Sequence, residues 1–529
     1  MGTKRARQKQ EELFYASERA EAPGHPFYQR LNAVLNGAGF DAFCEERCRQ
    51  FYHGNLGRPS LAPGVYFRLL LIGFFEGIGS ERGICWRVAD SLSLRRFLSY
   101  GLDESTPDHV TMSRTRRLFD EATHQAVFTF VLTEVARRGM LKGKTIGIDA
   151  TTLEANAAMR SIVRRDTGES YLEYLRKLAQ QAGIDPSDDD AVRRMDRKRK
   201  KKTSNEEWVN PHDPEAEVTK MKDGTTHLAY KAEQAVDLDT GAIVAITTHG
   251  GAMGDSESVR ATLPAAGYAV AEQIGTPTAQ GSYQVHEQGL CEVVTDKGYH
   301  SGAGLAEMSE SVRTYVSVPQ QPRRNWEGKA EQQAAVYANR RRVEGERGKS
   351  LLRRRGELLE RPFAHQYETG AMRRLHVRGR GNVAKRVLLQ AAAFNLALIL
   401  RSITKAGTPK GLANLKRKLV CALVRVLAAL SAFCAPLTTH RRSSPTTLPG
   451  SESAVIYARI QPPQKLGVLT RSPKSFVLTH SAGSSNLKWA KTARGKAASP
   501  TTRAIGRNTV FIQYLLIVVR QTSPRKVRE

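Results

Sequence analysis

The sequence predicts an α/β protein in which a mixed sheet flanked by helices follows an all-helical N-terminal region. Two apolar runs, Lys144–Asp149 and Cys291–Asp296, each end in an aspartate, as a buried strand does where it reaches the edge of a sheet. Residues 227–248 alternate apolar and polar side chains around an Asp-Thr-Gly turn, which is typical of a hairpin. The first 140 residues favour helices instead.

The N-terminal region is expected to consist of short helices joined by glycine turns. Pro63 begins an apolar run that ends at Gly77. Thr106-Pro107-Asp108 indicates a helix start, with the threonine as N-cap and proline at the first helical position. The helix that follows carries three arginines, Arg114, Arg116 and Arg117. Such a region resembles a helix-turn-helix module that binds a DNA major groove, and a helical bundle with a solvated basic face fits equally well.

The region after residue 143 is expected to form the sheet. Its strands are Thr145–Asp149, His227–Asp237, Ala242–Thr248, the run ending at Asp296, and Val312–Val318. A helix from Asp255 to about Glu272 follows the hairpin, and this order is that of a mixed sheet flanked by helices. An insertion at about 155–226 includes Arg197–Lys202, six basic residues in succession. Such a run is usually a solvated loop, and clamping of phosphates is the alternative.

The charge of the chain indicates a polyanionic partner. There are 81 Lys+Arg against 52 Asp+Glu, a formal net charge of +29, which fits DNA or RNA. A membrane is not expected, because the best candidate span, Leu419–Leu437, is interrupted by Arg425 and falls short of the roughly 20 residues that cross a bilayer. Six cysteines make no disulfide framework and the start lacks a signal segment, so we expect a cytoplasmic location.

Asp149 and Asp296 are the candidate catalytic and metal-binding residues. Cleavage of a phosphodiester develops charge on attacking and leaving oxygens, and two Mg²⁺ or Mn²⁺ ions roughly 3.5–4 Å apart stabilise both. Because Mg²⁺ takes only one or two protein carboxylates, three acids suffice for two ions. A lone strand-end aspartate is most often a turn former or a helix cap. Two of them in this strand order, with a third acid downstream, favour a metal site.

Four sequence strings carry a family resemblance: Ile148–Asn156, His227–Ala232, Val294–Ser301 and Glu360–His365. Together they resemble bacterial insertion-sequence DDE transposases with an InsH-like N-terminal domain, over about residues 25–405. The resemblance implies an RNase H-like catalytic domain, and a helical domain that binds the terminal inverted repeats of the element. It implies metal-dependent strand cleavage and transfer, with double-stranded DNA ends and target DNA as partners. At least a homodimer is expected, because two ends must be paired.

The resemblance places the first two acids of the family on Asp149 and Asp296, and a third in a helical pattern Tyr-x2-Arg-x3-Glu-x6-Lys. Glu344 matches the acid of this pattern, but Leu351 stands at the lysine position and glycines flank the acid. Glu360 lies in a segment that resembles the apolar-Glu-Arg-x-Phe core of the family. We therefore predict Glu360 as the third catalytic and metal-binding acid. The alternatives are Glu344, Glu346 and Glu357.

Further residues are expected to contact DNA. Lys297 and Tyr299 follow the second aspartate, where a phosphate or a flanking base would pass. Five arginines could line the DNA path beside the N-terminal three, and ordinary solvated charge is the alternative for each: Arg353, Arg354, Arg361, Arg373 and Arg374.

The chain divides by composition into five parts. These are a basic arm (1–24), a helical DNA-binding domain (25–140), a catalytic domain (141–405), a C-terminal helical segment (406–435) and a basic tail (436–529). The tail is rich in Ser, Thr and Pro and poor in acids, so we expect it to be disordered.

The function predicted from these observations is that of an insertion-sequence transposase. Two other functions remain open. A metal-dependent nuclease on the same fold would cut DNA without joining it, and a catalytically inactive remnant would only bind DNA.

Overall fold

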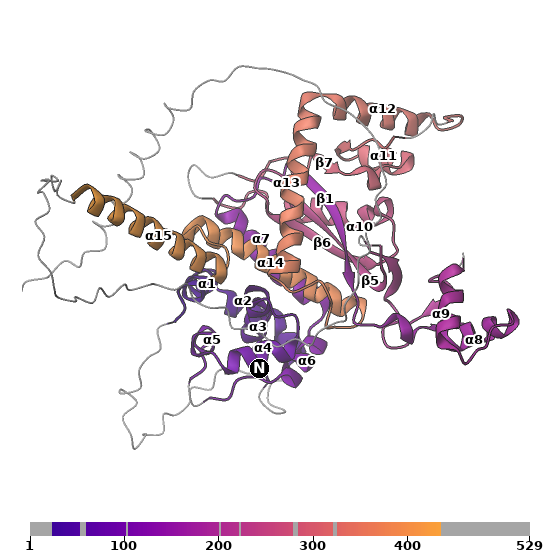
Figure 1. Ribbon diagram of the computed structural model, residues 1–529. Helices are drawn as coiled ribbons and strands as arrows, with labels where there is room; N and C mark the ends of the chain where they lie inside the picture. The colour runs from indigo at the N-terminus through magenta and orange to yellow at the C-terminus, as the bar shows by residue number, and fades with distance from the viewer. Residues whose placement is uncertain are drawn as a thin grey trace, which may run out of the picture. The chain divides into compact units, whose positions relative to one another are not determined.

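The computed structural model describes residues 24–52, 60–101, 104–199, 203–221, 224–278, 284–320 and 325–434 (Figure 1). These residues form a mixed α/β protein with a mixed sheet and many helices, which confirms the predicted class at that level. The tail expected at 436–529 and nearly all of the basic arm lie outside the described residues. The disorder expected of the tail therefore stays a prediction.

The N-terminal region is helical. Its elements are α1 (Pro26–Gly37), α2 (Phe40–Cys48), a 3-10 turn (Arg49–Phe51), α3 (Pro63–Glu76), α4 (Glu81–Ala89), α5 (Leu92–Phe97), α6 (His109–Leu118) and α7 (Glu121–Arg137). α3 is buried over most of its length because it is apolar on all sides, and Gly77 ends it with a φ of 73°. The predicted N-cap of α6 is wrong by two residues. Asp108, not Thr106, is the cap, and its carboxylate accepts a hydrogen bond from Thr111 N at 2.7 Å.

Among the described residues, six strands form one sheet: β1 (Thr145–Glu154), β4 (Glu217–Lys220), β5 (Thr226–Asp237), β6 (Ile243–Gly250), β7 (Glu292–Thr295) and β8 (Arg313–Val316). β1 is central, with β5 antiparallel on one side and β7 parallel on the other. β8 continues the sheet parallel to β7. β4 and β6 both pair with β5, antiparallel, on the edge opposite β1. The predicted hairpin is therefore β5 and β6, and the first strand lies between it and two parallel strands.

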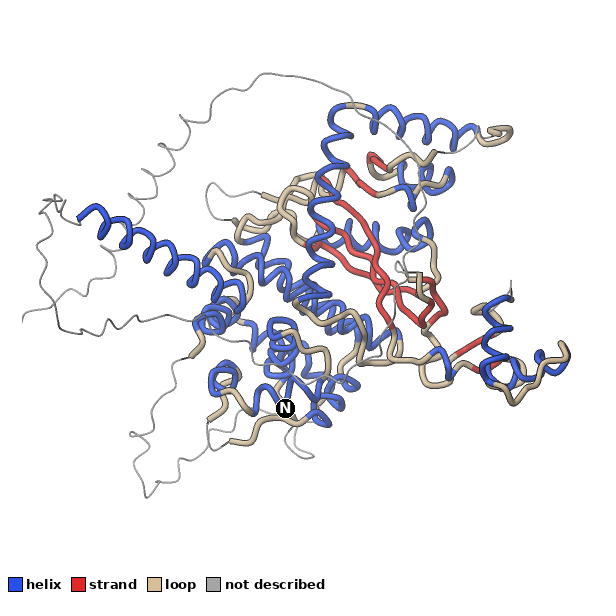
Figure 2. The backbone as a smooth tube through the Cα atoms, in the orientation of Figure 1, coloured by secondary structure: helices blue, strands red, loops and turns tan. Residues whose placement is uncertain are grey.

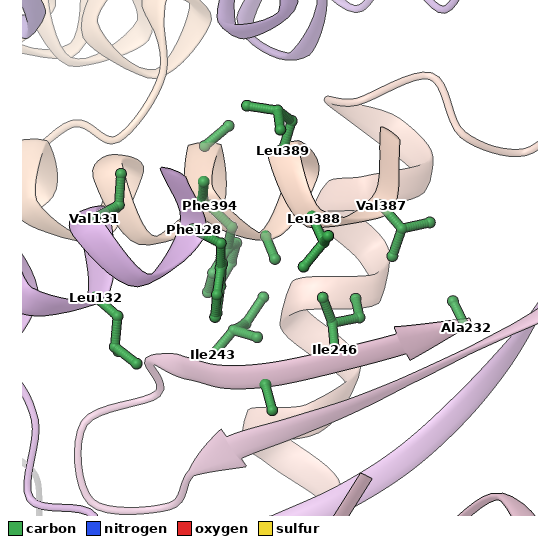
Figure 3. Close-up of a cluster of buried hydrophobic side chains, with 14 of the residues drawn as sticks. Phe128, Val131, Leu132, Ala232, Ile243, Ile246, Val387, Leu388, Leu389 and Phe394 are labelled. Atoms are coloured by element: carbon green, nitrogen blue, oxygen red, sulfur yellow. The ribbon is translucent and has the colours of Figure 1, made fainter. Parts of the chain in front are cut away.

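Helices flank this sheet (Figure 2). They are α10 (Asp255–Ala271), α11 (Gly302–Ser309), α12 (Ala330–Glu344), α13 (Glu346–Glu368) and α14 (Arg380–Thr404), with a 3-10 turn η4 (Lys297–Tyr299) after β7. α14 contacts both β6 and the N-terminal helices α3 and α7, so the helical region and the sheet share one core. Figure 3 shows part of it, where Phe128 of α7, Phe394 of α14 and Ile243 of β6 gather. Asn395 Oδ1 accepts a hydrogen bond from Ile243 N, and Asn395 Nδ2 donates one to Ile243 O. These two hydrogen bonds satisfy backbone groups of β6 at this strand edge.

The insertion forms helices and strands of its own. It contains a 3-10 turn (Met159–Ser161), α8 (Tyr171–Gln181), α9 (Asp189–Lys198) and a two-stranded sheet of β2 (Val163–Arg164) and β3 (Trp208–Val209). Leu175, Ala179 and Val192 form a separate apolar cluster between α8 and α9. The expectation of a plain loop at the basic run is wrong for Arg197 and Lys198, which end α9, while 200–202 lie outside the described residues.

The segment after α14 forms α15 (Pro409–Cys434). In the part of the chain that the structure describes, one helical span, Arg380–Leu430, is long and apolar enough to cross a membrane by length and composition alone. However, 72% of its most apolar window is buried inside the protein, as in the core helix of a protein without a membrane span. The burial of α14 against the sheet therefore accounts for its apolar sequence.

Candidate active site

β1 and β7 bring Asp149 and Asp296 to the same face of the sheet. The parallel ladder sets Gly147 opposite Val294, and each aspartate lies two residues further along its chain. Because strand side chains alternate between faces, both aspartates share a face with those two residues. The prediction that Asp149 ends its strand is wrong. β5 pairs with β1 as far as Glu154, and it is the pairing with β7 that stops before Asp149.

Asp296 directly follows β7 and is held by the turn that it begins. Its Oδ1 accepts a hydrogen bond from Gly298 N at 2.9 Å, which makes it the N-cap of η4. Asp149 Oδ1 likewise accepts from the next backbone amide, Ala150 N, at 2.9 Å. In each aspartate one oxygen is fixed by local backbone, and Oδ2 is the atom presented to the facing helix.

Arg355 of α13 contacts both of these Oδ2 atoms. Its Nη2 lies 3.0 Å from Asp149 Oδ2 and 3.8 Å from Asp296 Oδ2. The Arg355 side chain is 15% exposed, and its Nε is buried without a hydrogen-bond partner among the described residues. Two carboxylates from different strands thus converge on a single cationic nitrogen, which is an arrangement that suits a shared cation.

Gly147 allows α13 to lie this close to the sheet. A Cβ at position 147 would be 2.5 Å from Leu359 Cδ1 and 2.8 Å from a side-chain carbon of Leu238. Two hydrogen bonds then fix the helix: Gln234 Nε2 donates to Leu359 O at 3.0 Å, and Tyr367 Oη donates to Thr152 O at 2.9 Å. Leu359 itself is fully buried. The helix therefore has a defined rotation on the sheet, with Arg355 toward the aspartates.

The structure does not bring Glu360 to the two aspartates. Glu360 is exposed, and five residues along an α-helix turn it by about 140° from Arg355. The other candidates for the third acid form ion pairs away from the two aspartates: Glu344 with Arg340, Glu346 with Lys349, and Glu357 with Arg361. Within the described ranges no three His, Cys, Asp or Glu residues are grouped so as to hold a metal ion. The identity of the third acid stays a prediction.

A buried polar cluster lies behind the site, on the other face of β1 and β5. Glu233, which is fully buried, accepts hydrogen bonds from Ser258 Oγ at 2.6 Å, from Tyr299 Oη at 2.8 Å and from Thr262. Desolvation raises the pKa of Glu233, while these three hydroxyl donors oppose the rise. Beside it, Lys231 Nζ lies 2.6 Å from Asp255 Oδ1.

This cluster anchors the turn that carries Asp296. Tyr299 lies three residues after Asp296, and burial raises the pKa of its hydroxyl far above the usual range, so it remains a donor to Glu233. No local pattern predicts this hydrogen bond, because it joins a strand residue, Glu233 of β5, to a residue of the turn η4 that is 66 positions away. Asp255 is the first residue of α10, as the sequence predicts, and Gly254 is its N-cap.

The predicted DNA contacts of the catalytic domain have different environments. Tyr299 is 1% exposed, with its ring packed in the core and its hydroxyl bonded to Glu233, so the DNA-free structure does not present it to DNA and its predicted contact stays a prediction. Lys297 and Arg353 are exposed. Four further arginines are paired with acids: Arg354 with Asp239, Arg361 with Glu357, Arg373 with Glu368, and Arg374 with Glu154.

Residues 15–118 match a family model described as Transposase domain (DUF772). This match covers helices α1 to α6 and supports a transposase. No curated protein and no solved structure matches the chain.

The three predicted DNA-binding arginines of this matched region do not point the same way. Arg114 and Arg117 are exposed on α6. Arg116 Nε lies 2.7 Å from Glu81 Oε1, and both side chains are 15% exposed. Since Glu81 begins α4, this ion pair holds α6 against α4. Arg114 and Arg117 are therefore the better placed of the three to meet a phosphate.

Proposed function

We propose that the protein is a DDE transposase that cuts DNA at the ends of its element and transfers the freed 3′ ends to target DNA. The observation that carries this proposal is the convergence of Asp149 and Asp296 on one cationic nitrogen, in a chain whose first helices match a transposase domain. The RNase H-like architecture implied by the sequence resemblance is supported by the mixed sheet, in which β1 lies between an antiparallel hairpin and two parallel strands.

The two aspartates fit a divalent cation. Both Oδ2 atoms lie within 4 Å of the same nitrogen, and Mg²⁺ is bound by one or two protein carboxylates, water and substrate phosphate. A bound Mg²⁺ or Mn²⁺ would supply Lewis-acid stabilisation of the phosphoryl oxygens and a more acidic water or hydroxyl nucleophile. Asp149 and Asp296 would hold the first ion. A second ion needs a further acid, for which Glu360 is the residue we predict.

The basic residues of the chain would bind and orient the DNA. Lys297 is exposed one residue after Asp296, so a phosphate beside the metal would meet its ammonium group. Arg114 and Arg117 of α6 would contact the terminal inverted repeats. A net charge of +29 adds affinity that does not depend on sequence. We expect a homodimer or higher oligomer on DNA, in the bacterial cytoplasm, because two ends must be paired.

The experiment that tests this proposal is a cleavage and joining assay on DNA bearing the element's own ends, with Mg²⁺ or with EDTA. Asp149→Asn and Asp296→Asn should each remove several kcal/mol of transition-state stabilisation, roughly a 10³-fold loss in rate. Asp239→Asn is the matched control, because this acid pairs with Arg354 instead and lies outside the site. It should keep wild-type activity.

The products distinguish the candidate functions. Cleaved and joined DNA supports the transposase. Cleavage without any joined product would make the protein a nuclease, and binding without Mg²⁺-dependent cleavage would make it an inactive remnant. Wild-type activity of Asp149→Asn would refute the metal site altogether.

A further inference from the structure

Arg355 lies where the cation of the proposed site would be. We propose that this arginine closes the metal site in the DNA-free protein and opens it by moving onto a DNA phosphate, so that metal and DNA bind cooperatively. The proposal rests on the function proposed above and adds a form of regulation to it. In this proposal the Arg355 side chain binds either the two aspartates or a DNA phosphate.

The first place is between the two aspartates. The Nη2 atom is 3.0 Å and 3.8 Å from the two Oδ2 oxygens, so it neutralises carboxylates that would otherwise repel each other. A metal ion bound to both Oδ2 atoms would have to occupy the same space, since Mg²⁺ binds its oxygens at about 2.0–2.1 Å. The guanidinium and the metal therefore compete.

Arg355 does not make the two-bond contact by which an arginine usually binds a carboxylate. A guanidinium has five N–H donors and binds carboxylate best through two parallel hydrogen bonds. Arg347, two turns earlier on α13, does this: its Nε and Nη2 both donate to the carboxylate of Glu292. Arg355 instead contacts two carboxylates through a single nitrogen, and its buried Nε has no acceptor among the described residues. Arg347 thus makes the two parallel hydrogen bonds that suit a guanidinium, whereas Arg355 does not and keeps a buried donor unused.

The second place is a phosphate at the same edge of the sheet. Phosphate oxygens match the fork of a guanidinium and would satisfy the donors that the aspartates leave unused. Lys297, exposed beside Asp296, would hold a DNA backbone at this position. The side chain of Asp296 is 40% exposed and that of Asp149 is 24% exposed, so the site is open to such an approach.

The consequence is reciprocal coupling between the two ligands. DNA that removes Arg355 from the aspartates raises the affinity for metal, and metal raises the affinity for DNA by the same factor. The DNA-free protein is then kept from binding metal productively.

The test measures how tightly the full-length protein binds Mn²⁺. The electron paramagnetic resonance signal of free Mn²⁺ reports the binding, with and without a random-sequence DNA duplex at low salt. Wild type should bind Mn²⁺ on the order of tenfold more tightly when the duplex is present, within the usual range of coupling between two sites. Arg355→Gln should bind Mn²⁺ that tightly without DNA, and the duplex should add less than twofold. Arg260→Gln, which removes an exposed guanidinium of α10 paired with Glu307, is the matched control and should behave as wild type.

Two results would overturn the inference. One is an Arg355→Gln variant that binds Mn²⁺ as wild type does without DNA. The other is a duplex that tightens Mn²⁺ binding by the same factor in wild type and in Arg355→Gln. If Mn²⁺ binding is lost in Asp149→Asn but does not respond to Arg355, the proposed function stands and this inference fails. If no protein binds Mn²⁺ under any condition, both fail together.

Arg355→Lys keeps the measurement decisive if the glutamine variant does not fold. Lysine retains a positive charge but lacks the planar fork. It should still compete with Mn²⁺ in the DNA-free protein and show a smaller response to the duplex. A lysine variant identical to wild type in both measurements would count against a role for the guanidinium fork.

Discussion

The strands and the helix that meet at the candidate site position their side chains in different ways. On β1 and β7 side chains alternate between two faces, and the parallel ladder aligns the neighbours, so Asp149 and Asp296 are brought together by register alone. On α13 each residue turns the side chain by about 100°, so the residue that faces the aspartates depends on how the helix rotates on the sheet. That residue is Arg355, while Glu360 is exposed. The half of the site on the sheet thus follows from strand register, whereas the half on the helix depends on how α13 packs.

The strongest test of this contrast is Arg355→Glu. The introduced carboxylate would face Asp149 and Asp296 without any cation, so we expect the metal-free protein to lose roughly 3 kcal/mol of unfolding free energy, as when a partly buried ion pair is broken. Mn²⁺ should restore this stability, because three acids then bind the ion. Chemical denaturation with Mn²⁺ and with EDTA measures both effects.

Glu360→Gln is the control from the same helix. It should leave stability unchanged with and without Mn²⁺, because the side chain is exposed in the DNA-free protein. The cleavage assay then decides its catalytic role. If Arg355→Glu is as stable as wild type and gains nothing from Mn²⁺, the rotation of α13 described above does not hold in solution.

The contact between helix and strand is tested by Gly147→Ala. A Cβ there would lie 2.5 Å from Leu359 Cδ1, so the buried Leu359 side chain or α13 itself must shift, at a cost of about 1–3 kcal/mol in unfolding free energy. Gly356→Ala on α13 is the matched control, because its Cβ would meet nothing within 4 Å and alanine is favoured over glycine by about 1 kcal/mol in helices. Equal effects of the two substitutions in urea unfolding would contradict the close approach.

The same contrast explains what the sequence could predict. The sequence predicts Asp149 and Asp296 because an apolar run that ends in an acid is a local signal, and it predicts the hairpin because alternating apolar and polar residues around a turn are one too. The extension of β1 to Glu154 was missed because pairing with β5, a partner distant in sequence, maintains it. Glu233 and Tyr299 were missed for a similar reason, since their hydrogen bond joins residues 66 positions apart.

Arg355 was missed although a local signal existed. Three arginines in succession, Arg353 to Arg355, have the composition of a solvated surface. Yet Leu351, Arg355 and Leu359 follow one another at a spacing of four, which places the arginine on a buried face between two leucines that the structure shows to be buried. An arginine on an apolar helix face needs a buried partner, and the two aspartates provide it.

Tyr299→Phe tests whether the cluster behind the sheet supports the strand half of the site. The loss of one hydroxyl donor to the buried Glu233 should cost about 1–2 kcal/mol of unfolding free energy at neutral pH. The pKa of Glu233 is already raised by burial, and losing this donor raises it further. Because the unfolded chain then loses its proton first, stability falls as pH rises above the ordinary glutamate value of 4.5 toward the folded pKa.

The deficit of Tyr299→Phe should therefore be smaller at about pH 4.5 than at about pH 7, as measured by urea unfolding at each pH. Tyr268→Phe serves as control, since Tyr268 is 75% exposed and its substitution should change neither stability nor its pH dependence. A deficit that does not vary with pH would mean that the hydroxyl acts through packing and not through the charge of Glu233.

The smallest expected effects concern the arginines of α6, where the rotation of a helix again decides which residue faces outward. Arg114→Gln and Arg117→Gln should each lower the salt dependence of DNA binding by about 0.9 in the log–log slope, as one lost phosphate contact does. Arg116→Gln should leave the slope unchanged and instead destabilise the helical domain, because Arg116 is paired with Glu81 between α6 and α4. DNA titrations over a range of salt concentrations measure the slope, and thermal unfolding measures the stability. If Arg116→Gln changes the slope as its neighbours do, its pair with Glu81 must open when DNA binds, and α6 would then present all three arginines to the same groove.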